Sequence, residues 1–288
     1  MDFRKEIINK IKVNRPKITS SSVVTYASLL FTLNKKLGGD SNLEWFTKSA
    51  KAIVDHVEEN KVKQTQKTLL SALYILTGLE EYKALMLTIC HEVNLEYKSQ
   101  KLNPKQKANR VSWETVLAKY EQVKKILKAD PSEDNYVNFF IIACMSGVLW
   151  PPRRNEWVYV KLKNYNKEID NYYDKSCFFF NKYKTAFKYK LQTIKVKKDF
   201  AVLMGKWLKV NKTDYLLYNP NTGKPLSSSD LTKRLHTLFG KDVGCSALRS
   251  TYLSHIYKDM PALQKMEDTA TAMSHTVNAA FLNYVKKD

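Results

Sequence analysis

The sequence contains few glycines and prolines, which interrupt regular secondary structure, and few cysteines, which can form disulfides. Its 288 residues include 8 glycines, 8 prolines and 4 cysteines. The cysteines (Cys90, Cys144, Cys177 and Cys245) are scattered without metal-ligand spacing, so they indicate thiols in a reducing, intracellular compartment. No apolar run is long enough to cross a bilayer, and we find no secretory signal peptide at the start. These absences exclude a disulfide-stapled secreted domain and a membrane-spanning protein.

Acidic residues are also too few to balance the basic ones. The chain has 28 Asp and Glu against 48 Lys and Arg, which gives a formal net charge of +20. Such an excess predicts a polyanionic partner, with nucleic acid as the first candidate and an anionic membrane surface as the second. At 44% hydrophobic residues the chain can still bury a core, and its length predicts one large domain or two ordinary ones.

The first third of the chain predicts helices. Residues 1–20 are basic and polar, and we expect them to form an arm that ends at the run Thr19–Ser22. Beyond that run, residues 20–97 carry apolar positions at helical spacing, such as Leu69, Leu73 and Leu76. The pattern predicts a compact domain of about four helices.

A basic segment follows at residues 98–112. It contains no acid, and Pro104 lies in its middle, which is typical of a linker. Either a solvated tether or a segment that lies against DNA phosphates fits this composition. Its cations, the candidate DNA contacts, are Lys98, Lys101, Lys105, Lys107 and Arg110.

The remainder of the chain, residues 113–288, contains both helical and β-strand sequence patterns. Helices are expected at 113–127 and 136–149, and again from residue 200 onwards. Between them, the runs 157–160, 176–180 and 191–196 are rich in β-formers and predict a small antiparallel sheet. Lys184 would lie near a hairpin turn of that sheet, and the neighbouring Lys188 and Lys190 are further candidate DNA contacts. The fold expected overall is mainly α with a small antiparallel β-sheet.

The chemistry concentrates in four short pieces. Near the end of the chain a histidine precedes a tyrosine by nine positions, and a phenol with a pKa of ~10 becomes a nucleophile only when cationic groups surround the phosphate it attacks. Three earlier pieces offer such cations. In chain order the pieces are Arg153 with Glu156 three positions later, Lys184-Thr185, Arg249 in Ala-Leu-Arg-Ser-Thr, and His275 with Tyr284.

This order and spacing resemble the catalytic domain of the tyrosine recombinases, the phage-type integrases. The family pattern is Arg-x-x-Glu, a hairpin Lys often followed by Thr, His-x-x-Arg, and Gly-His with a Tyr nine positions on. The resemblance covers nearly the whole chain. It implies a helical core-binding domain at 1–97, a basic linker at 98–112 and an α+β catalytic domain at 113–288, in an enzyme of viral or mobile-element type that carries out DNA integration.

The resemblance also implies roles for the five matched residues. Tyr284 would attack a DNA phosphodiester and form a 3′-phosphotyrosyl link, and Lys184 would protonate the leaving 5′-oxygen. Arg153 and Arg249 would stabilise the charge on the non-bridging oxygens, and His275 would assist. Neither a metal, another cofactor nor ATP is expected.

The sequence departs from the family pattern at several positions. Ser246 stands where the family has His or Lys, and Ser274 stands where it has Gly. Arg154 adjoins Arg153 and could bind a neighbouring phosphate, while Lys182 is an alternative to Lys184. Four residues follow the tyrosine, whereas some relatives exchange a longer C-terminal helix between subunits.

Three functions remain open at this point. The leading one is a site-specific recombinase that acts on double-stranded DNA, with a homodimer on each site and a homotetramer at synapsis. A type IB topoisomerase shares the same chemistry and works as a monomer. The third is a DNA-binding protein without catalytic activity.

Overall fold

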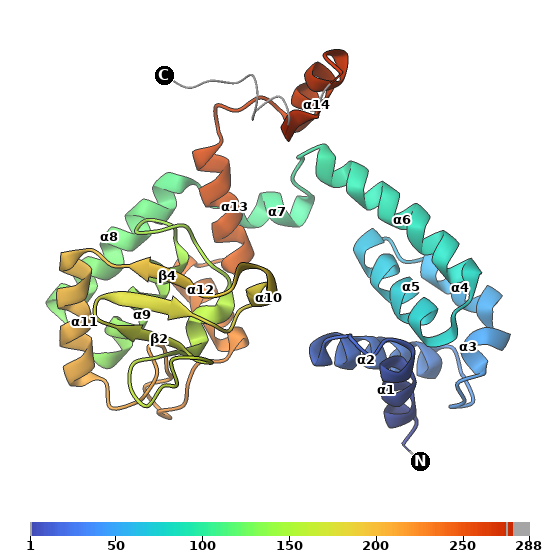
Figure 1. Ribbon diagram of the computed structural model, residues 1–288, viewed down its shortest axis with the longest axis horizontal. Coiled ribbons are helices and arrows are strands. Elements are labelled where there is room, and N and C mark those ends of the chain that lie inside the picture. The colour runs from blue at the N-terminus through green and yellow to red at the C-terminus, as the bar shows by residue number, and fades with distance from the viewer. Residues whose placement is uncertain (1, 275, 279–288) are drawn as a thin grey trace. The chain divides into compact units, whose positions relative to one another are not determined.

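The computed structural model describes residues 2–274 and 276–278. The contacts between Cα atoms divide the chain into two compact units (Figure 1). The first unit contains the described residues of Met1–Lys101 and Pro261–Asp288, and the second is Leu102–Met260. The described chain is mainly helical and carries one small sheet.

The first unit is built from helices around a core of aliphatic side chains. Leu30, Leu70 and Leu73 are fully buried there, and the Tyr82 hydroxyl donates to the carbonyl oxygen of Phe46 at 2.7 Å. Its helices are α1 (Phe3–Asn14), α2 (Ser20–Lys36), α3 (Trp45–Lys48), α4 (Ala50–Glu58), α5 (Lys63–Thr77), α6 (Glu80–Lys98) and α14 (Leu263–Ala272).

The N-terminal residues form helix α1, and the prediction of an arm was wrong. Phe3, Ile7 and Ile11 lie four residues apart, on one face of α1, and all three are buried in the core of this unit. The side chain of Asp2 caps the helix by accepting from the Arg4 amide at 3.1 Å. The apolar stripe of α1 is only one residue wide and is surrounded by lysines and arginines, so the sequence pattern did not indicate a helix.

Helix α14 is joined to the end of α6 within the first unit. Lys98 pairs with Glu267 at 3.1 Å, and the side-chain oxygen of Gln100 accepts from the Leu263 amide at 2.9 Å. The described residues beyond Met260 therefore belong by contact to the helical unit, although the expected catalytic domain runs to residue 288.

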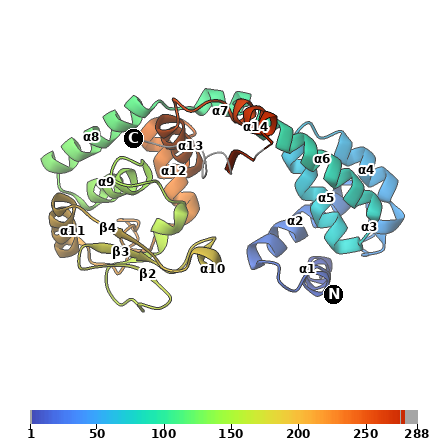
Figure 2. The same ribbon diagram turned by 45° about the horizontal axis from the view of Figure 1, so that its top comes forward.

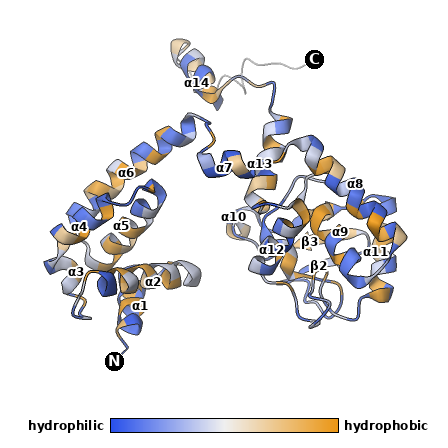
Figure 3. Cartoon of the chain, turned by 180° about the vertical axis from the view of Figure 1, so that it is seen from behind, coloured by the Kyte–Doolittle hydropathy of each residue, from blue (hydrophilic) through white to orange (hydrophobic). Residues whose placement is uncertain are grey.

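The second unit is centred on helix α9. Nine of its residues are buried, including Phe139 and Phe140, and Figure 3 shows how hydrophobic this helix is. Hydrophobic side chains around its whole circumference are typical of a helix in a protein core. The helices of this unit are α7 (Pro104–Asn109), α8 (Trp113–Ala129), α9 (Glu133–Met145), the 3₁₀ helix η1 (Asn155–Tyr159), α10 (Ala186–Tyr189), α11 (Lys198–Val210), α12 (Ser228–Phe239) and α13 (Cys245–Ile256).

The sheet is mixed, whereas the sequence predicted a purely antiparallel one. Its strands are β1 (Val160–Lys161), β2 (Asn171–Asp174), β3 (Cys177–Phe180) and β4 (Gln192–Lys195), in the order β1-β2-β3-β4. Strands β2, β3 and β4 are labelled in Figure 2. The β1–β2 pair is parallel, and the other two pairs are antiparallel. The run 157–160, expected as a strand, forms mainly η1, and Trp157 within it is fully buried in the core.

Aromatic side chains join the sheet to the helices. Trp157 meets Phe178 and Phe180 edge-on, with ring centroids 5.0 and 4.9 Å apart. Phe178 in turn lies 6.2 Å from Phe200 of α11, which contacts Phe140 of α9 at 5.6 Å. Such aromatic pairs add about 0.5–1.5 kcal/mol each beyond the area that they bury. The strands that carry the expected hairpin are therefore firmly anchored to the core.

The segment expected as a basic linker contains helix α7. Pro104 occupies its first turn, where proline is favoured, and Asn103 forms a capping box with Gln106. Lys241 donates from Nζ to the Arg110 carbonyl oxygen at 3.1 Å, and Thr251 donates to that of Val111 at 3.0 Å. Residues 102–111 are thus part of the second unit.

We expect Gly147→Ala to destabilise the second unit. Gly147 follows the end of α9 with φ +91°, and a Cβ there would lie 2.5 Å from Cδ2 of Tyr252 and 3.3 Å from Cδ of Pro152. The free energy of unfolding should fall by about 1–3 kcal/mol in urea denaturation. Gly205→Ala in α11 is the control, because a Cβ there meets nothing within 4 Å and alanine favours a helix. Equal losses in both variants would contradict this account of Gly147.

Candidate functional site

The second unit contains a cavity of about 380 Å³ that brings four predicted site residues together. We call it the four-cation cavity, because Arg153, Arg154, Lys184 and Arg249 line it and Glu156 is the one carboxylate among its lining residues. The cations come from the segment before η1, from the β3–β4 connection and from α13. Its full lining is Pro151, Pro152, Arg153, Arg154, Glu156, Tyr183, Lys184, Thr185, Tyr189, Gln192 and Arg249.

Arg153 forms a packed wall of this cavity. Its guanidinium lies 4.1 Å from the ring centre of Phe180 and 4.9 Å from that of Tyr183, and its Nε is 3.3 Å from a carboxylate oxygen of Glu156. The Arg153 side chain is 17% exposed, and burial lowers its pKa below the usual value, while Glu156 and Tyr183 oppose that change. Cys245 donates its thiol to the Arg153 carbonyl oxygen at 3.3 Å.

Arg154 and Arg249 present their charge differently. Arg154 is exposed and Arg249 is half-buried in the second turn of α13. Within residues 2–274 and 276–278, neither side chain forms an ion pair, whereas Arg153 shares its charge with Glu156. The positive charge available to an anion in this cavity is therefore concentrated on Arg154, Arg249 and Lys184.

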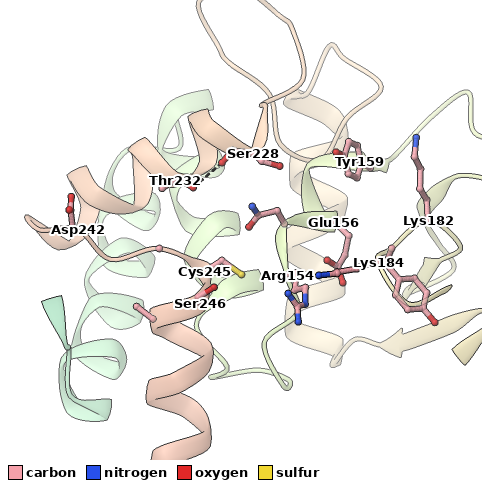
Figure 4. A pocket seen from close by; sticks show the side chains of 14 residues that line it. Arg154, Glu156, Tyr159, Lys182, Lys184, Ser228, Thr232, Asp242, Cys245 and Ser246 are labelled. Carbon is pink, nitrogen blue, oxygen red and sulfur yellow. Dashed lines mark hydrogen bonds between the residues drawn. The ribbon is translucent and has the colours of Figure 1, made fainter. Parts of the chain in front are cut away.

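An adjoining cavity of about 660 Å³ is lined by both Lys184 and Lys182 (Figure 4). Four residues line both cavities: Lys184, Arg154, Glu156 and Tyr183. Lys182 lines the adjoining cavity but not the four-cation cavity. In Figure 4 the side chain of Lys184 points toward Arg154 and Glu156, and that of Lys182 extends away from them. The Lys182 ammonium lies over the Tyr159 ring at 5.3 Å. Of the two lysines, Lys184 is therefore the one placed among the arginines.

Asn171 of β2 is a positioning residue that the sequence analysis missed. It is 1% exposed, and its side-chain amide donates to the carbonyl oxygens of Glu156 at 3.3 Å and of Lys182 at 2.9 Å. Its side-chain oxygen accepts from the Lys182 amide at 2.7 Å. Asn171 thereby ties the segment that carries Arg153 and Glu156 to the loop that carries Lys184. A lone asparagine outside the predicted β-rich runs carries no sequence pattern that distinguishes such a role.

Ser246, which stands at the family's His or Lys position, lies in the first turn of α13. The N-cap of that helix is Gly244, which forms no side-chain cap, and Gly244, Cys245, Ser246 and Ala247 line the adjoining cavity. Burial raises the pKa of Cys245 to about 11, so its thiol stays neutral near pH 7. Ser246 can donate one hydroxyl hydrogen bond there but carries no charge.

Ser246 also borders a third cavity, of about 240 Å³, which we call the linker cavity. Lys105 and Arg110 line it, together with Ser246 and Ser250 of α13. Two cations of the predicted basic linker thus face the same helix turn as Ser246. The remaining predicted DNA contacts, all exposed, are Lys98, Lys101, Lys107, Lys188 and Lys190; of these, Lys98 is paired with Glu267.

His275 and Tyr284 lie outside the described residues. Ser274, just before the histidine, is described and has φ +58°. That left-handed conformation is the one for which glycine is favoured, and the family pattern has glycine at this position.

Two further observations concern the described part of the chain. No helix within it is long and apolar enough to cross a membrane. No group of three or more His, Cys, Asp or Glu side chains among the same residues is placed to hold a metal ion.

We expect Glu156→Gln to destabilise the second unit. The substitution keeps the shape of the side chain but leaves the partly buried Arg153 guanidinium without its carboxylate, which should cost about 2 kcal/mol in urea unfolding. Glu121→Gln is the matched control, because Glu121 is 56% exposed and 3.8 Å from Lys124 on α8. If the two variants unfold alike, the Arg153–Glu156 pair does not stabilise the cavity wall.

Comparison with known proteins shows a distant similarity in structure. No protein-family model matches the sequence, and no curated protein matches it. Among solved structures, the crystal structure of XerA recombinase is similar over 100% of this chain and 95% of its own, with 13% sequence identity and a TM-score of 0.35.

Proposed function

We propose that this protein is a DNA strand transferase of the tyrosine-recombinase kind. The observation that carries the proposal is the four-cation cavity, in which one carboxylate accompanies four cations brought from three separate elements. Like charges repel, so such a grouping is costly unless an anion binds it. A phosphodiester fits the charge, and the net charge of +20 extends the preference to a polyanion.

The cations have distinct parts in the proposed reaction. Arg154 and Arg249, which form no ion pair with the residues that the structure describes, bind the non-bridging oxygens of the phosphate, and Arg153 forms the wall beside them. The first turn of α13 lines the adjoining cavity, which shares Arg154 and Lys184 with the four-cation cavity, and Ser246 adds a hydroxyl donor there in place of the family's titratable group. An arginine keeps its charge at every pH at which DNA is stable, so this part of the site does not depend on pH.

The bond changes follow from the family resemblance of the sequence. The Tyr284 phenol oxygen attacks phosphorus and loses its proton with the help of His275, while the bond to the 5′-oxygen breaks. Lys184 donates a proton to that oxygen, which leaves as a 5′-hydroxyl. One phosphodiester replaces another, so the reaction needs no ATP, and rejoining is its reverse. We further propose that two protomers bind one DNA site and four assemble at synapsis.

The tyrosine assignment predicts a covalent adduct. We expect wild-type protein to become linked to nicked duplexes with a randomised central sequence, because the short fragment beyond the nick diffuses away and rejoining fails. Denaturing gels would detect the adduct, and sequencing of the trapped DNA would reveal any preferred site. Tyr284→Phe, which removes only the nucleophilic oxygen, should form none.

An adduct with Tyr284→Phe would disprove the assignment of the nucleophile. Relaxation of supercoiled plasmid by dilute protein, without exchange of strands between two captured sites, would instead indicate a topoisomerase. Salt-dependent DNA binding without an adduct in any variant would indicate a binding protein.

The surroundings of the three arginines in the cavity predict different effects of their substitution on activity and on stability. Arg154→Gln and Arg249→Gln should each lower the rate of adduct formation by about 100-fold or more, because each removes a donor to the developing charge. Arg154→Gln should unfold like wild type, since Arg154 is exposed. Arg153→Gln should lower both the rate and the free energy of unfolding, because its guanidinium packs on Phe180 and Tyr183. Lys128→Gln, an exposed lysine of α8, is the control and should change neither quantity.

A further inference from the structure

The loop between β3 and β4 exposes an aromatic side chain to solvent. Phe187 of α10 is 80% exposed, more than any other large hydrophobic residue that the structure describes. Tyr189 and Leu191 follow it at 54% and 49% exposure. A single exposed apolar residue needs no explanation, but three within five positions of one loop form a patch that favours a partner.

The loop holds this patch in an ordered conformation. The Tyr183 hydroxyl donates to the carbonyl oxygen of Lys190 and closes the loop at its base. Gln192 donates from its side chain to the Tyr189 carbonyl oxygen at 2.8 Å, and the Lys190 amide donates to Ala186 at 2.9 Å. Phe187 is therefore held in solvent by a structured turn, at the cost of leaving its ring unburied.

The chemistry around Phe187 selects the partner. Residues 176–198 contain seven lysines and no acid, and four of these lysines (Lys182, Lys184, Lys188 and Lys190) lie in this loop. A protein partner would have to match an aromatic group set among cations, whereas a nucleic acid offers phosphates and base faces together. The loop also borders the four-cation cavity, because Lys184, Thr185 and Tyr189 line it. Phe187 lies between Thr185 and Tyr189, two positions from each.

We propose that Phe187 is a wedge that inserts between two bases of duplex DNA beside the phosphate bound in the four-cation cavity. The inference rests on the proposed function and adds a specific contact to it. Apolar side chains that enter a base step from the minor groove unstack it, at a cost of about a few kcal/mol, and bend the duplex. The lysines on either side of Phe187 offset that cost by binding the flanking phosphates.

The wedge would serve strand transfer. Once the phosphodiester is cleaved, the 5′-hydroxyl strand must leave its own duplex before it can join another. A base step that is already unstacked beside the cleavage point lowers the barrier to that departure. Phe187 is accordingly a positioning residue for the DNA and takes no part in the bond changes.

Fluorescence of 2-aminopurine tests the proposal, because this base brightens when it is unstacked. The probe is a set of duplexes with 2-aminopurine at successive positions around the trapped cleavage site, or at successive positions of a mixed-sequence duplex if no site is trapped. The protein is the full chain with Tyr284→Phe, which leaves the DNA uncut. Anisotropy of an end label on the same duplexes reports binding independently.

We expect the protein to brighten 2-aminopurine several-fold at one or two adjacent positions. Adding Phe187→Ala should abolish the brightening while DNA binding weakens by less than about tenfold, since the phosphate contacts remain. Phe187→Leu should retain part of the brightening, because leucine also acts as a wedge. Val202→Ala, at an apolar site of α11 that is 56% exposed, should leave it unchanged. All three substitutions should leave the unfolding curve unchanged.

The outcomes separate this proposal from the proposed function. Tight DNA binding without brightening, or brightening that survives Phe187→Ala, would overturn the wedge and leave the proposed function standing. Failure of the protein to bind DNA at all would overturn both. Binding to phosphatidylserine vesicles that Phe187→Ala abolishes, with no brightening on DNA, would identify the patch as a membrane contact and overturn the wedge.

Discussion

The structure of the second unit depends on holding four cations around one small cavity against their mutual repulsion. Three kinds of contact do this. Glu156 supplies a carboxylate to Arg153, the faces of Phe180 and Tyr183 support its guanidinium, and Asn171 fixes the two backbone segments that carry the charges. The carboxylate and the aromatic faces lie against the charge of Arg153, and Asn171 satisfies buried polar groups of the backbone. The remaining charge faces solvent, where an anion can reach it.

In this arrangement the two adjacent arginines, Arg153 and Arg154, have different surroundings. Arg153 and Arg154 are neighbours in the chain, yet one packs on aromatic rings and the other is exposed at the mouth of two cavities. A structural arginine and a binding arginine can therefore stand side by side, and only their surroundings distinguish them.

Much of the fold could be predicted from local patterns. The helices of residues 20–97 and 113–149 match their apolar periodicity, and the β3–β4 hairpin with Lys184 in its connection lies where β-rich runs predicted it. Helix α1 was missed because its three core residues stand among basic ones. Strand β2 was missed because Asn171 and Asp174, at its two ends, are poor β-formers. Helix α7 was missed because Pro104 was interpreted as a break in the chain, whereas it occupies the first turn of a helix.

The sequence by itself determined the charge, the order of the candidate cations and the mainly helical character, since these follow from composition and short-range spacing. Only the tertiary structure decided that Arg153, Arg154, Lys184 and Arg249 line one cavity, that Lys184 rather than Lys182 borders both hollows, and that Phe187 stays exposed. The reason is physical. Burial and charge pairing at each of these residues depend on neighbours that are far away in the chain. Local periodicity in the sequence does not identify such neighbours.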